Sequence, residues 1–375
     1  MIGSWSRRAW LRSLVVAAGG MSVRATGWAQ DLERPPPEGK HINLAGNENP
    51  FGPSPDVVRR ILRAAPESCR YPFREEYVLK ELIARREQVP IDHILLGNGA
   101  DEVLALAAAA FLTPGGEVVA TTPTYFQLTD YAAKRGAIMR WVPHRRETMQ
   151  HDLPALERAV GSKTQLVYVC NPDNPTGTAV NSAELEAFCR AVCPRAPVVV
   201  DEVYLELQDS FPADTQVRLI QEGLPLIVVR SFSKMHGLAG HRIGYAVAPP
   251  RLLETLQRWQ MSSLNYLGVI AARESLFDQS FHAWTLGKIR AGRARFCALL
   301  DELGLRYTPS HGNFVFHEVR RPVTDYQARM EVRGFLVNWP HAPVEPYLDW
   351  CRTSIGTDDE MRRHEQAMRE VFAAA

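Results

Sequence analysis

Cysteine pairs that would mark a zinc site are missing from this sequence. Its six cysteines show no Cys-x-x-Cys spacing and no histidine-rich partner segment, whereas structural zinc sites usually carry closely spaced ligands of these types. Cys189 and Cys193 stand four residues apart on one predicted helix, which is more typical of two packed thiols than of a disulfide or a metal pair. We therefore expect no metal site, and the redox state of the cysteines stays open.

An excess of positive charge is also missing. The formal net charge is +1, and Arg7, Arg8, Arg12 and Arg24 lie in the first 29 residues, which contain no acidic residue. The rest of the chain therefore carries 1 − 4 = −3. A protein that binds nucleic acid usually presents a basic face, so we expect no nucleic-acid partner. With 46% hydrophobic and 23% charged residues, the composition is that of an ordinary globular protein.

The amino terminus lacks an apolar run long enough to span a membrane, because residues 14–18 are followed by glycines. The charged start at residues 6–12, the short apolar middle and the small residues before Ala29 predict a secretory signal, and the Arg7–Arg8 pair resembles the twin-arginine type. We expect cleavage after Ala29 and export of the folded protein by the twin-arginine machinery to the periplasm or beyond. No cysteine lies near that point, so we expect no stable membrane anchor. The alternative is a basic leader with no targeting role.

Strand and helix patterns alternate through the middle of the chain. A proline-bounded linker leads into an arm over 43–53 that has neither a helix period nor a strand period. From residue 94 to 201, short apolar strands alternate with amphipathic helices, and a further strand is predicted over 226–230. This pattern predicts an α/β fold with a mainly parallel sheet that is covered on both faces.

Beyond Arg251 the predicted helices become longer, and strand-like segments follow them. The last helix begins with a capping box, in which Thr357 and Glu360 satisfy each other's free backbone donors. These features predict a smaller α+β domain. The expected organisation is a signal peptide over 1–29, a linker and amino-terminal arm over 30–53, a large cofactor-binding domain over 54–265 and a small domain over 266–375.

The segment Ser231–Arg242, with the sequence SFSKMHGLAGHR, follows the predicted strand over 226–230. Lys234 is therefore expected at the carboxyl end of a strand, where open α/β sheets bind ligands, and its amine can form a Schiff base with an aldehyde. Ser231, Ser233 and Arg242 offer hydroxyl groups and a guanidinium to a phosphate. Together they predict pyridoxal 5'-phosphate, which carries both an aldehyde and a phosphate. The alternative is a solvated loop with a surface lysine.

Two more segments can contact such a cofactor. Residues 97–102 form a glycine-rich turn that opens a helix, so the backbone N–H groups there can bind the phosphate, although an unliganded helix start has the same sequence pattern. Tyr125 follows the next strand and can stack on the pyridine ring, or it can belong to the core.

The other end of the cofactor also has candidate partners. Asn174 lies in the turn-rich segment 171–177 and can donate to the phenolic oxygen, which Tyr204 can share. Asp201 ends the apolar strand over 198–200, where a carboxylate is unfavourable to bury without a cation. A protonated pyridine nitrogen is such a cation and keeps the ring an electron sink. A helix cap or a salt bridge to the second domain would also account for Asp201.

Taken together, the motifs GNGADE, NPDNPTG, DEVY, SFSKMHGLAGHR and CRTSIGT, in this order and spacing, resemble those of the class I/II aminotransferases of fold type I. The early NENPFGP motif and the Tyr71–Pro72 pair resemble the histidinol-phosphate aminotransferase branch. The resemblance covers about residues 40 to 370. It implies a large domain with a mainly parallel seven-stranded sheet, a smaller α+β domain, bound pyridoxal 5'-phosphate and a homodimer.

The resemblance also implies a role for each motif residue. Lys234 would be the Schiff-base lysine and the proton carrier between the substrate Cα and the cofactor C4' atom. Arg352 would bind the substrate α-carboxylate through two parallel hydrogen bonds. The cofactor would be held at its pyridine nitrogen by Asp201, at its phenolic oxygen by Asn174 and Tyr204, at its ring face by Tyr125, and at its phosphate by Ala100, Asp101, Ser231, Ser233, Arg242 and Tyr71 of the partner subunit.

One departure from the family pattern concerns the substrate. Asn338 stands where the histidinol-phosphate enzymes usually carry an arginine that binds the substrate phosphate. A charge-assisted hydrogen bond contributes about 1.5 to 3 kcal/mol, so its loss weakens binding by about one to two orders of magnitude. We therefore expect a substrate other than histidinol phosphate, with a neutral or aromatic side chain near Phe51 and Trp339.

The function expected from these residues is transfer of an amino group between an amino acid and a 2-oxo acid by a PLP-dependent aminotransferase. Another reaction at Cα, by a decarboxylase, lyase or racemase, stays open because substrate orientation selects the bond that breaks. A non-catalytic binding or regulatory protein that carries the cofactor is the other alternative. The sequence does not name the amino donor or acceptor.

Overall fold

The computed structural model describes residues 41–337 and 347–373. The chain divides into two units, Met1–Lys40 and His41–Ala375, and the fold described below is that of the second. The expected signal peptide, Asn338 and Trp339 lie outside the described residues. Within the described ranges, no helix is both long enough and apolar enough to cross a membrane.

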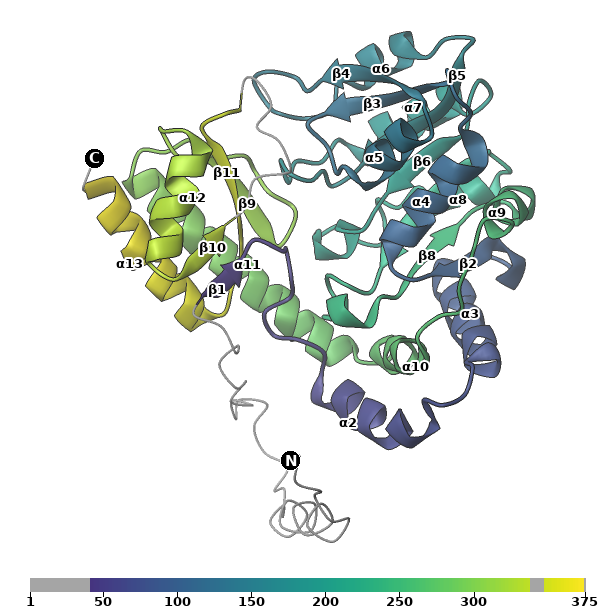
Figure 1. Cartoon of the computed structure of the whole chain (residues 1–375), viewed down its shortest axis with the longest axis horizontal. Helices are drawn as coiled ribbons and strands as arrows, with labels where there is room; N and C mark the ends of the chain where they lie inside the picture. Colours follow the sequence, from purple (N-terminus) through teal and green to yellow (C-terminus); the bar gives the residue numbers. More distant parts are fainter. Residues whose placement is uncertain (1–40, 338–346, 374–375) are drawn as a thin grey trace, which may run out of the picture. The chain divides into compact units, whose positions relative to one another are not determined.

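A seven-stranded sheet forms the centre of the larger part of the fold (Figure 1), with the strand order β2-β8-β7-β6-β5-β3-β4. Its strands are β2 (Ile94–Gly97), β3 (Glu117–Thr122), β4 (Ile138–Pro143), β5 (Thr164–Cys170), β6 (Val198–Asp201), β7 (Leu226–Ser231) and β8 (Gly244–Val247). Neighbouring strands are parallel from β4 across to β7, whereas β8 is antiparallel to both β7 and β2. The expectation of a mainly parallel sheet is therefore confirmed.

Helices cover both faces of this sheet, because the central strands are apolar on both sides. In β6, Val198 and Val200 belong to one hydrophobic cluster and Val199 to another, as the alternation of side chains along a strand requires. One cluster includes residues of α3, α7 and α10, and the other includes residues of α4, α5 and α9. The helices of this part are α2 (Pro55–Ala64), α3 (Phe73–Glu87), α4 (Ala100–Phe111), α5 (Gln127–Lys134), α6 (Leu153–Ala159), α7 (Ser182–Val192), α8 (Val217–Gln221), α9 (Pro250–Gln257) and α10 (Tyr266–Ser275).

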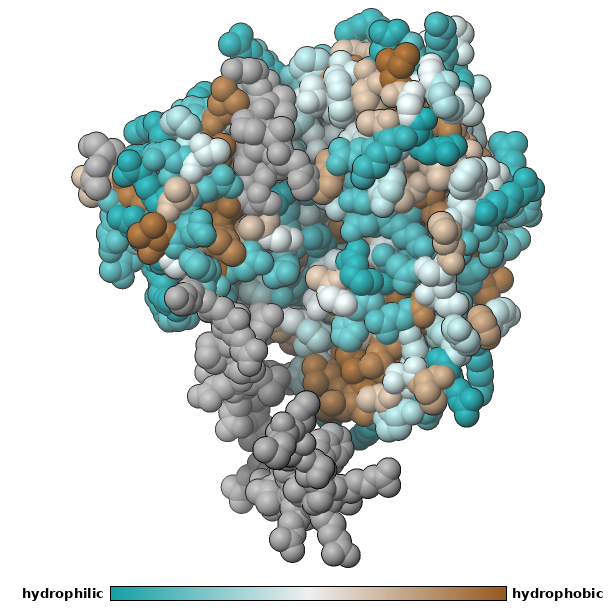
Figure 2. Space-filling model, in the orientation of Figure 1, coloured by the Kyte–Doolittle hydropathy of each residue, from teal (hydrophilic) through white to brown (hydrophobic). Residues whose placement is uncertain are grey.

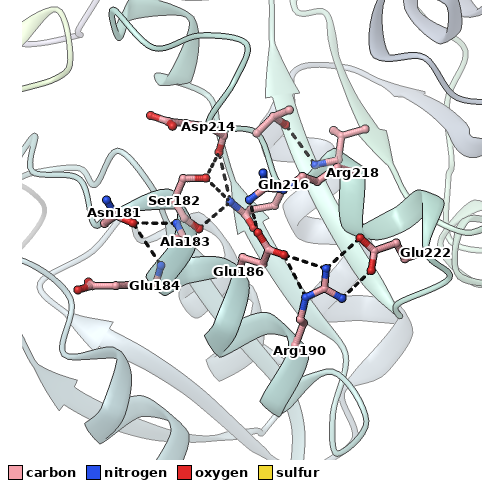
Figure 3. A network of polar contacts seen from close by, with 12 residues as sticks. Asn181, Ser182, Ala183, Glu184, Glu186, Arg190, Asp214, Gln216, Arg218 and Glu222 are labelled. Carbon is pink, nitrogen blue, oxygen red and sulfur yellow. Dashed lines mark hydrogen bonds and ion pairs between the residues drawn. The ribbon is translucent and has the colours of Figure 1, made fainter.

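A polar network joins α7 to α8 at the surface (Figure 3). Asn181 caps α7 by accepting hydrogen bonds from backbone N–H groups of the first turn. Arg190 donates to Glu186 in its own helix and to Glu222 just beyond α8, while Arg218 also pairs with Glu186. Exposed ion pairs contribute little to stability, so the buried apolar side of α7 holds it on the sheet.

A second, smaller core lies in the carboxyl-terminal part of the fold. It contains buried side chains such as Phe296, Phe316 and Tyr326. Its elements are α11 (Gln279–Glu302), β9 (Phe314–Glu318), α12 (Val323–Val332), β10 (Phe335–Val337), β11 (Trp350–Ser354) and α13 (Asp358–Ala373). Strand β11 pairs with β9 in antiparallel fashion. The expected smaller α+β arrangement is therefore present. Helix α10, which was expected within it, packs instead with the larger part of the fold.

The amino-terminal arm differs from its prediction at one end. Residues 43–53 were expected to have no strand, but β1 (Ile42–Leu44) pairs in parallel with β10 of the smaller core. Three residues are too few for a period of two to be recognised in the sequence, and the partner strand lies almost three hundred residues on. The rest of the arm continues from this strand into the candidate site.

Candidate active site

A cavity of about 500 Å³ lies at the carboxyl ends of the parallel strands. Residues 45–48 of the arm and Arg352 of β11 complete its wall. The predicted site residues that line it are Lys234, Ala100, Asp101, Tyr125, Asn174, Asp201, Tyr204, Ser231, Ser233, Arg242 and Arg352. Tyr71 does not line it, being 73% exposed and stacked on Phe73, and Asn338 lies outside the described residues.

Lys234 lies at the centre of this group, three residues beyond the end of β7. Its Nζ atom donates to the backbone carbonyl of Asn47 at 3.0 Å and lies 5.4 Å from the ring centroid of Tyr204. Removal from water, reinforced by the nearby Arg352 guanidinium, lowers the pKa of the Lys234 amine to about 8. A larger fraction of the amine is therefore uncharged near neutral pH and able to act as a nucleophile.

One end of the cavity suits a phosphate. Helix α4 begins at Ala100, after Gly99 with φ of +83°, so backbone N–H groups of its first turn face outward from the helix end. A Cβ atom on Gly99 would lie 2.3 Å from the Arg242 side chain, so glycine allows that guanidinium to approach the helix start. Arg242 also donates to Asp101 at 2.7 Å. The hydroxyls of Ser231 and Ser233 line the same cavity.

A buried carboxylate in the cavity suits a cationic ring nitrogen. Asp201 is 1% exposed, and its carboxylate accepts hydrogen bonds from the Tyr168 hydroxyl at 3.0 Å and the Val203 backbone N–H at 3.1 Å. Neither donor carries a charge, and burial raises the pKa of the Asp201 carboxyl to about 7. A protonated pyridine nitrogen would provide the missing positive charge, so the residues present fit pyridoxal 5'-phosphate at both ends.

Arg352 joins the two parts of the fold at the cavity. It is 6% exposed, donates to the side-chain oxygen of Asn174 and donates to the Ala45 carbonyl at 2.7 Å. Because the Asn174 oxygen faces Arg352, its amide nitrogen points the other way and can donate to a ligand oxygen. Arg352 Nε has no hydrogen-bond partner among the described residues, which leaves this buried guanidinium with capacity for an anion.

Asn47 is a site residue that the sequence did not single out. It is 1% exposed, has a φ of +50° and donates from Nδ2 to the Tyr204 hydroxyl at 3.0 Å. Its Oδ1 atom accepts from the Ser354 hydroxyl at 3.1 Å. The cluster of amides between glycine and proline in the arm was the available signal, but nothing in the sequence distinguished Asn47 from Asn43 or Asn49.

This combination of fold and site defines a class of protein, namely the PLP-dependent transferases that move amino groups. A family model for class I and II aminotransferases matches residues 39–366. The chain belongs to the class I and II aminotransferase family, and it is a PLP-dependent enzyme. The expected reaction class and cofactor are confirmed.

Particular relatives narrow the comparison further. The chain is 34% identical over 338 residues to the histidinol-phosphate aminotransferase of Moorella thermoacetica, covering 88% of this chain and 86% of that protein. It is 36% identical over 332 residues to the corresponding enzyme of Symbiobacterium thermophilum, covering 88% and 90% of the two chains. The crystal structure of histidinol-phosphate aminotransferase from Sinorhizobium meliloti, in complex with pyridoxal 5'-phosphate, superposes with a TM-score of 0.83 at 29% identity and covers 89% of this chain and 91% of that one.

These relatives confirm the similarity to the histidinol-phosphate aminotransferase branch. They do not bear out the expectation that histidinol phosphate is excluded as a substrate, because the relatives carry that name. That expectation depended on one position, Asn338, and a single missing arginine does not by itself exclude a substrate.

Proposed function

We propose that Lys234 is the lysine that holds the cofactor and carries the proton during transamination. The observation that supports this most directly is that Lys234, Asp201 and Arg352 line one cavity of about 500 Å³ although they come from three separate segments. When bound, pyridoxal 5'-phosphate supplies an electron sink for the carbanion at the substrate Cα. The Lys234 amine, with its lowered pKa, can accept the proton from the substrate Cα and pass it on to the cofactor C4' atom.

The remaining cavity residues orient the cofactor. Asp201 pairs with the ring nitrogen, Asn174 and Tyr204 donate to the phenolic oxygen, and Tyr125 covers the ring. The hydroxyl of Tyr125 already donates to Asp101 at 2.8 Å, which fixes the direction of its ring. Ala100 and Asp101, at the start of α4, bind the phosphate together with Ser231, Ser233 and Arg242.

Arg352 binds the anionic group of the substrate, since a guanidinium matches a carboxylate or phosphate in two parallel hydrogen bonds. The substrates are then an amino acid, or an amine with a phosphate in the same place, and a 2-oxo acid. We propose histidinol phosphate as the first amine to test, because the curated relatives act on it according to their names.

A half-reaction assay tests this proposal. Mixing the purified enzyme with single amines, including histidinol phosphate and the common amino acids, should convert the cofactor to its amine form, seen as a shift in absorbance. Lys234→Ala should abolish both the absorbance band of the lysine-bound cofactor and turnover. Carbon dioxide release, or racemisation without a 2-oxo acid product, would instead identify another reaction at Cα.

A homodimer would complete the site, with Tyr71 of the partner subunit reaching the phosphate. Large hydrophobic side chains support this, since Leu62 on α2, Phe73 on α3 and Phe277 beyond α10 are each 68% exposed. Figure 2 shows a hydrophobic area near the position of α2 and α10 in Figure 1. Sedimentation of the purified protein should give twice the chain mass, and Tyr71→Phe should weaken cofactor retention without dissociating the dimer.

Export by the twin-arginine route is the proposed fate of the chain. The support is the paired Arg7 and Arg8 before a short apolar run and Ala29. A reporter fused to residues 1–30 should appear outside the cytoplasm. The same reporter with both arginines changed to lysine should stay in the cytoplasm. Export of the lysine variant would contradict the twin-arginine assignment.

A further inference from the structure

Three buried side chains meet beside the cofactor cavity without a role in the proposed reaction. His144 follows the end of β4, His151 precedes α6, and Asp173 lies in the loop after β5. Because β4, β3 and β5 are neighbours in the sheet, their carboxyl ends bring these residues together. One nitrogen of each histidine and one oxygen of Asp173 all lie within 4.8 Å of one another.

The histidine nearest to Asp173 lacks hydrogen bonds. The side chain of His144 is 0% exposed, and neither of its ring nitrogens has a hydrogen-bond partner among the described residues. Its Nε2 atom lies 3.6 Å from Oδ2 of Asp173, which is too far for a hydrogen bond. Burying an imidazole with both nitrogens unpaired is unfavourable, so a further atom between these groups would stabilise the arrangement.

Asp173 is a buried carboxylate whose side-chain hydrogen-bond donors carry no positive charge. It is 0% exposed, and its two oxygens accept hydrogen bonds from the hydroxyls of Thr124 at 2.9 Å and Thr176 at 3.0 Å. Both donors are neutral hydroxyls, so neither balances the negative charge of an ionised Asp173 carboxylate. A positive charge between Asp173 and His144 would satisfy both groups.

We propose that His144, His151 and Asp173 form a structural site for a divalent transition-metal ion of the zinc class. Two imidazole nitrogens and one carboxylate oxygen are a ligand set that zinc accepts. Bonds of about 2.0 to 2.1 Å in a tetrahedral site place ligand atoms about 3.3 Å apart. His144 Nε2 lies 3.6 Å from Asp173 Oδ2, His151 Nε2 lies 4.0 Å from Asp173 Oδ1, and one ligand atom from each residue lies within 4.8 Å of the other two. Binding would therefore draw the ligand atoms together by up to about 1.5 Å.

His151 takes part through a change of tautomer. At present its Nε2 atom contacts the Cys170 carbonyl at 2.6 Å, and its Nδ1 atom contacts the Thr121 hydroxyl at 2.9 Å. When Nε2 binds the ion, it gives up its hydrogen bond to the Cys170 carbonyl. The ring proton then resides on Nδ1 and is donated to the Thr121 oxygen, which can accept it. Such an outer hydrogen bond is the usual way in which a metal-bound histidine is oriented.

The site would be structural, because all three ligands are buried. A water molecule would complete the tetrahedron as the fourth ligand. It would connect the β4–α6 loop to the loop that carries Asn174, next to Asp173. No metal signal was recognisable in the sequence, because these ligands come from two loops and none is a cysteine. This inference does not depend on the reaction that the enzyme catalyses.

Binding of Co²⁺ and Zn²⁺ to the chelator-treated, cofactor-loaded full chain tests the proposal. We expect one ion per chain, visible-range Co²⁺ bands of a tetrahedral site that zinc removes, and a rise of a few degrees in the unfolding temperature with zinc. His144→Leu and Asp173→Asn should each lower the affinity at least about 100-fold and remove the thermal shift.

His364→Leu is the matched control. His364 is also 0% exposed with both ring nitrogens unpartnered among the described residues, but it lies in α13 away from this carboxylate, so its replacement should leave metal affinity unchanged. Absence of stoichiometric binding, or equal affinity in the wild type and His144→Leu, would overturn the proposal. If His144→Leu does not fold, Asp173→Asn decides the question by the same criterion.

Discussion

The side-chain amine of Lys234 donates a hydrogen bond to the backbone carbonyl of Asn47 at 3.0 Å, across 187 positions of the chain. The side chain of Asn47 in turn donates to the hydroxyl of Tyr204. One residue of the amino-terminal arm therefore contacts both the amine and a phenol at the candidate reaction centre. The arm therefore lines the candidate active site, and its integrity should control reactivity.

Replacing Asn47 by alanine should lower turnover by about two- to tenfold, because a buried hydrogen bond contributes about 0.5 to 1.5 kcal/mol. The Tyr204 hydroxyl loses its amide donor in this variant, so the absorbance of the bound cofactor should also change its pH dependence. Steady-state kinetics and a pH titration of the spectrum measure both effects. The control is Asn43→Ala, because the exposed Asn43 side chain accepts from the nearby Ala45 N–H and does not line the cavity. Equal kinetics in the two variants would contradict the role of Asn47.

Asp201→Asn should stabilise the cofactor-free protein above pH 7. Burial raises the pKa of Asp201 from 3.8 to about 7. Between these two pH values the carboxyl is protonated in the folded state and ionised in the unfolded state. Stability therefore falls as pH rises through this window, by about 1.4 kcal/mol per unit of pKa shift and about 4 kcal/mol in all. The asparagine variant does not titrate and keeps this stability.

Urea unfolding of the cofactor-free wild type and Asp201→Asn, at pH 4 and pH 8, measures this difference. The two proteins should have similar midpoints at pH 4, and the variant should be the more stable at pH 8. With cofactor bound, the order should reverse at pH 8, because the variant loses its partner for the ring nitrogen. A constant difference between the proteins across pH would refute the assignment of a raised pKa.

Loading of the cofactor-free enzyme with pyridoxal 5'-phosphate should accelerate with rising pH and level off above about pH 8. The neutral amine is the nucleophile, and the pKa of Lys234 is about 8 because of burial and the positive charge of Arg352. Stopped-flow absorbance gives the rate at each pH. Arg352→Gln removes a positive charge, so its midpoint should move to higher pH, whereas a midpoint near 10 in the wild type would rule out the lowered pKa.

Arg352→Lys should raise the KM of anionic amine substrates by about 10- to 100-fold and change kcat less. A lysine is a point charge and cannot form the two parallel hydrogen bonds of a guanidinium, and a charge-assisted bond contributes about 1.5 to 3 kcal/mol. Initial rates over a range of substrate concentration separate the two constants. Arg190→Lys, in the exposed network of Figure 3, is the control and should leave both constants unchanged.

Several features of the fold followed from local sequence. The capping box at the last helix forms as expected, with the Thr357 N–H donating to Glu360 and the Glu360 N–H to Thr357. Strand β6 was recognised because its apolar residues are buried on both faces. The residues that follow strands, such as Lys234 and Asn174, could be grouped because the carboxyl ends of parallel strands meet at one edge.

Long-range partners could not be derived in this way. The pairing of β1 with β10 and the bond between Asn47 and Tyr204 join segments that are distant in the chain, and neither leaves a periodic pattern. The cluster of His144, His151 and Asp173 has the same origin, since the order of strands β4, β3 and β5 decides which loops are neighbours.

The sequence by itself therefore predicted the α/β class, the reaction family and those cavity residues that follow strands, such as Lys234 and Asn174, because each depends on a local motif or on a residue's position relative to its own strand or helix. Only the tertiary structure decided how the arm closes on Lys234, which groups shift the pKa values of Lys234 and Asp201, and which buried histidines face a carboxylate. Burial and electrostatic contacts act through space, so these properties depend on which chain segments pack together.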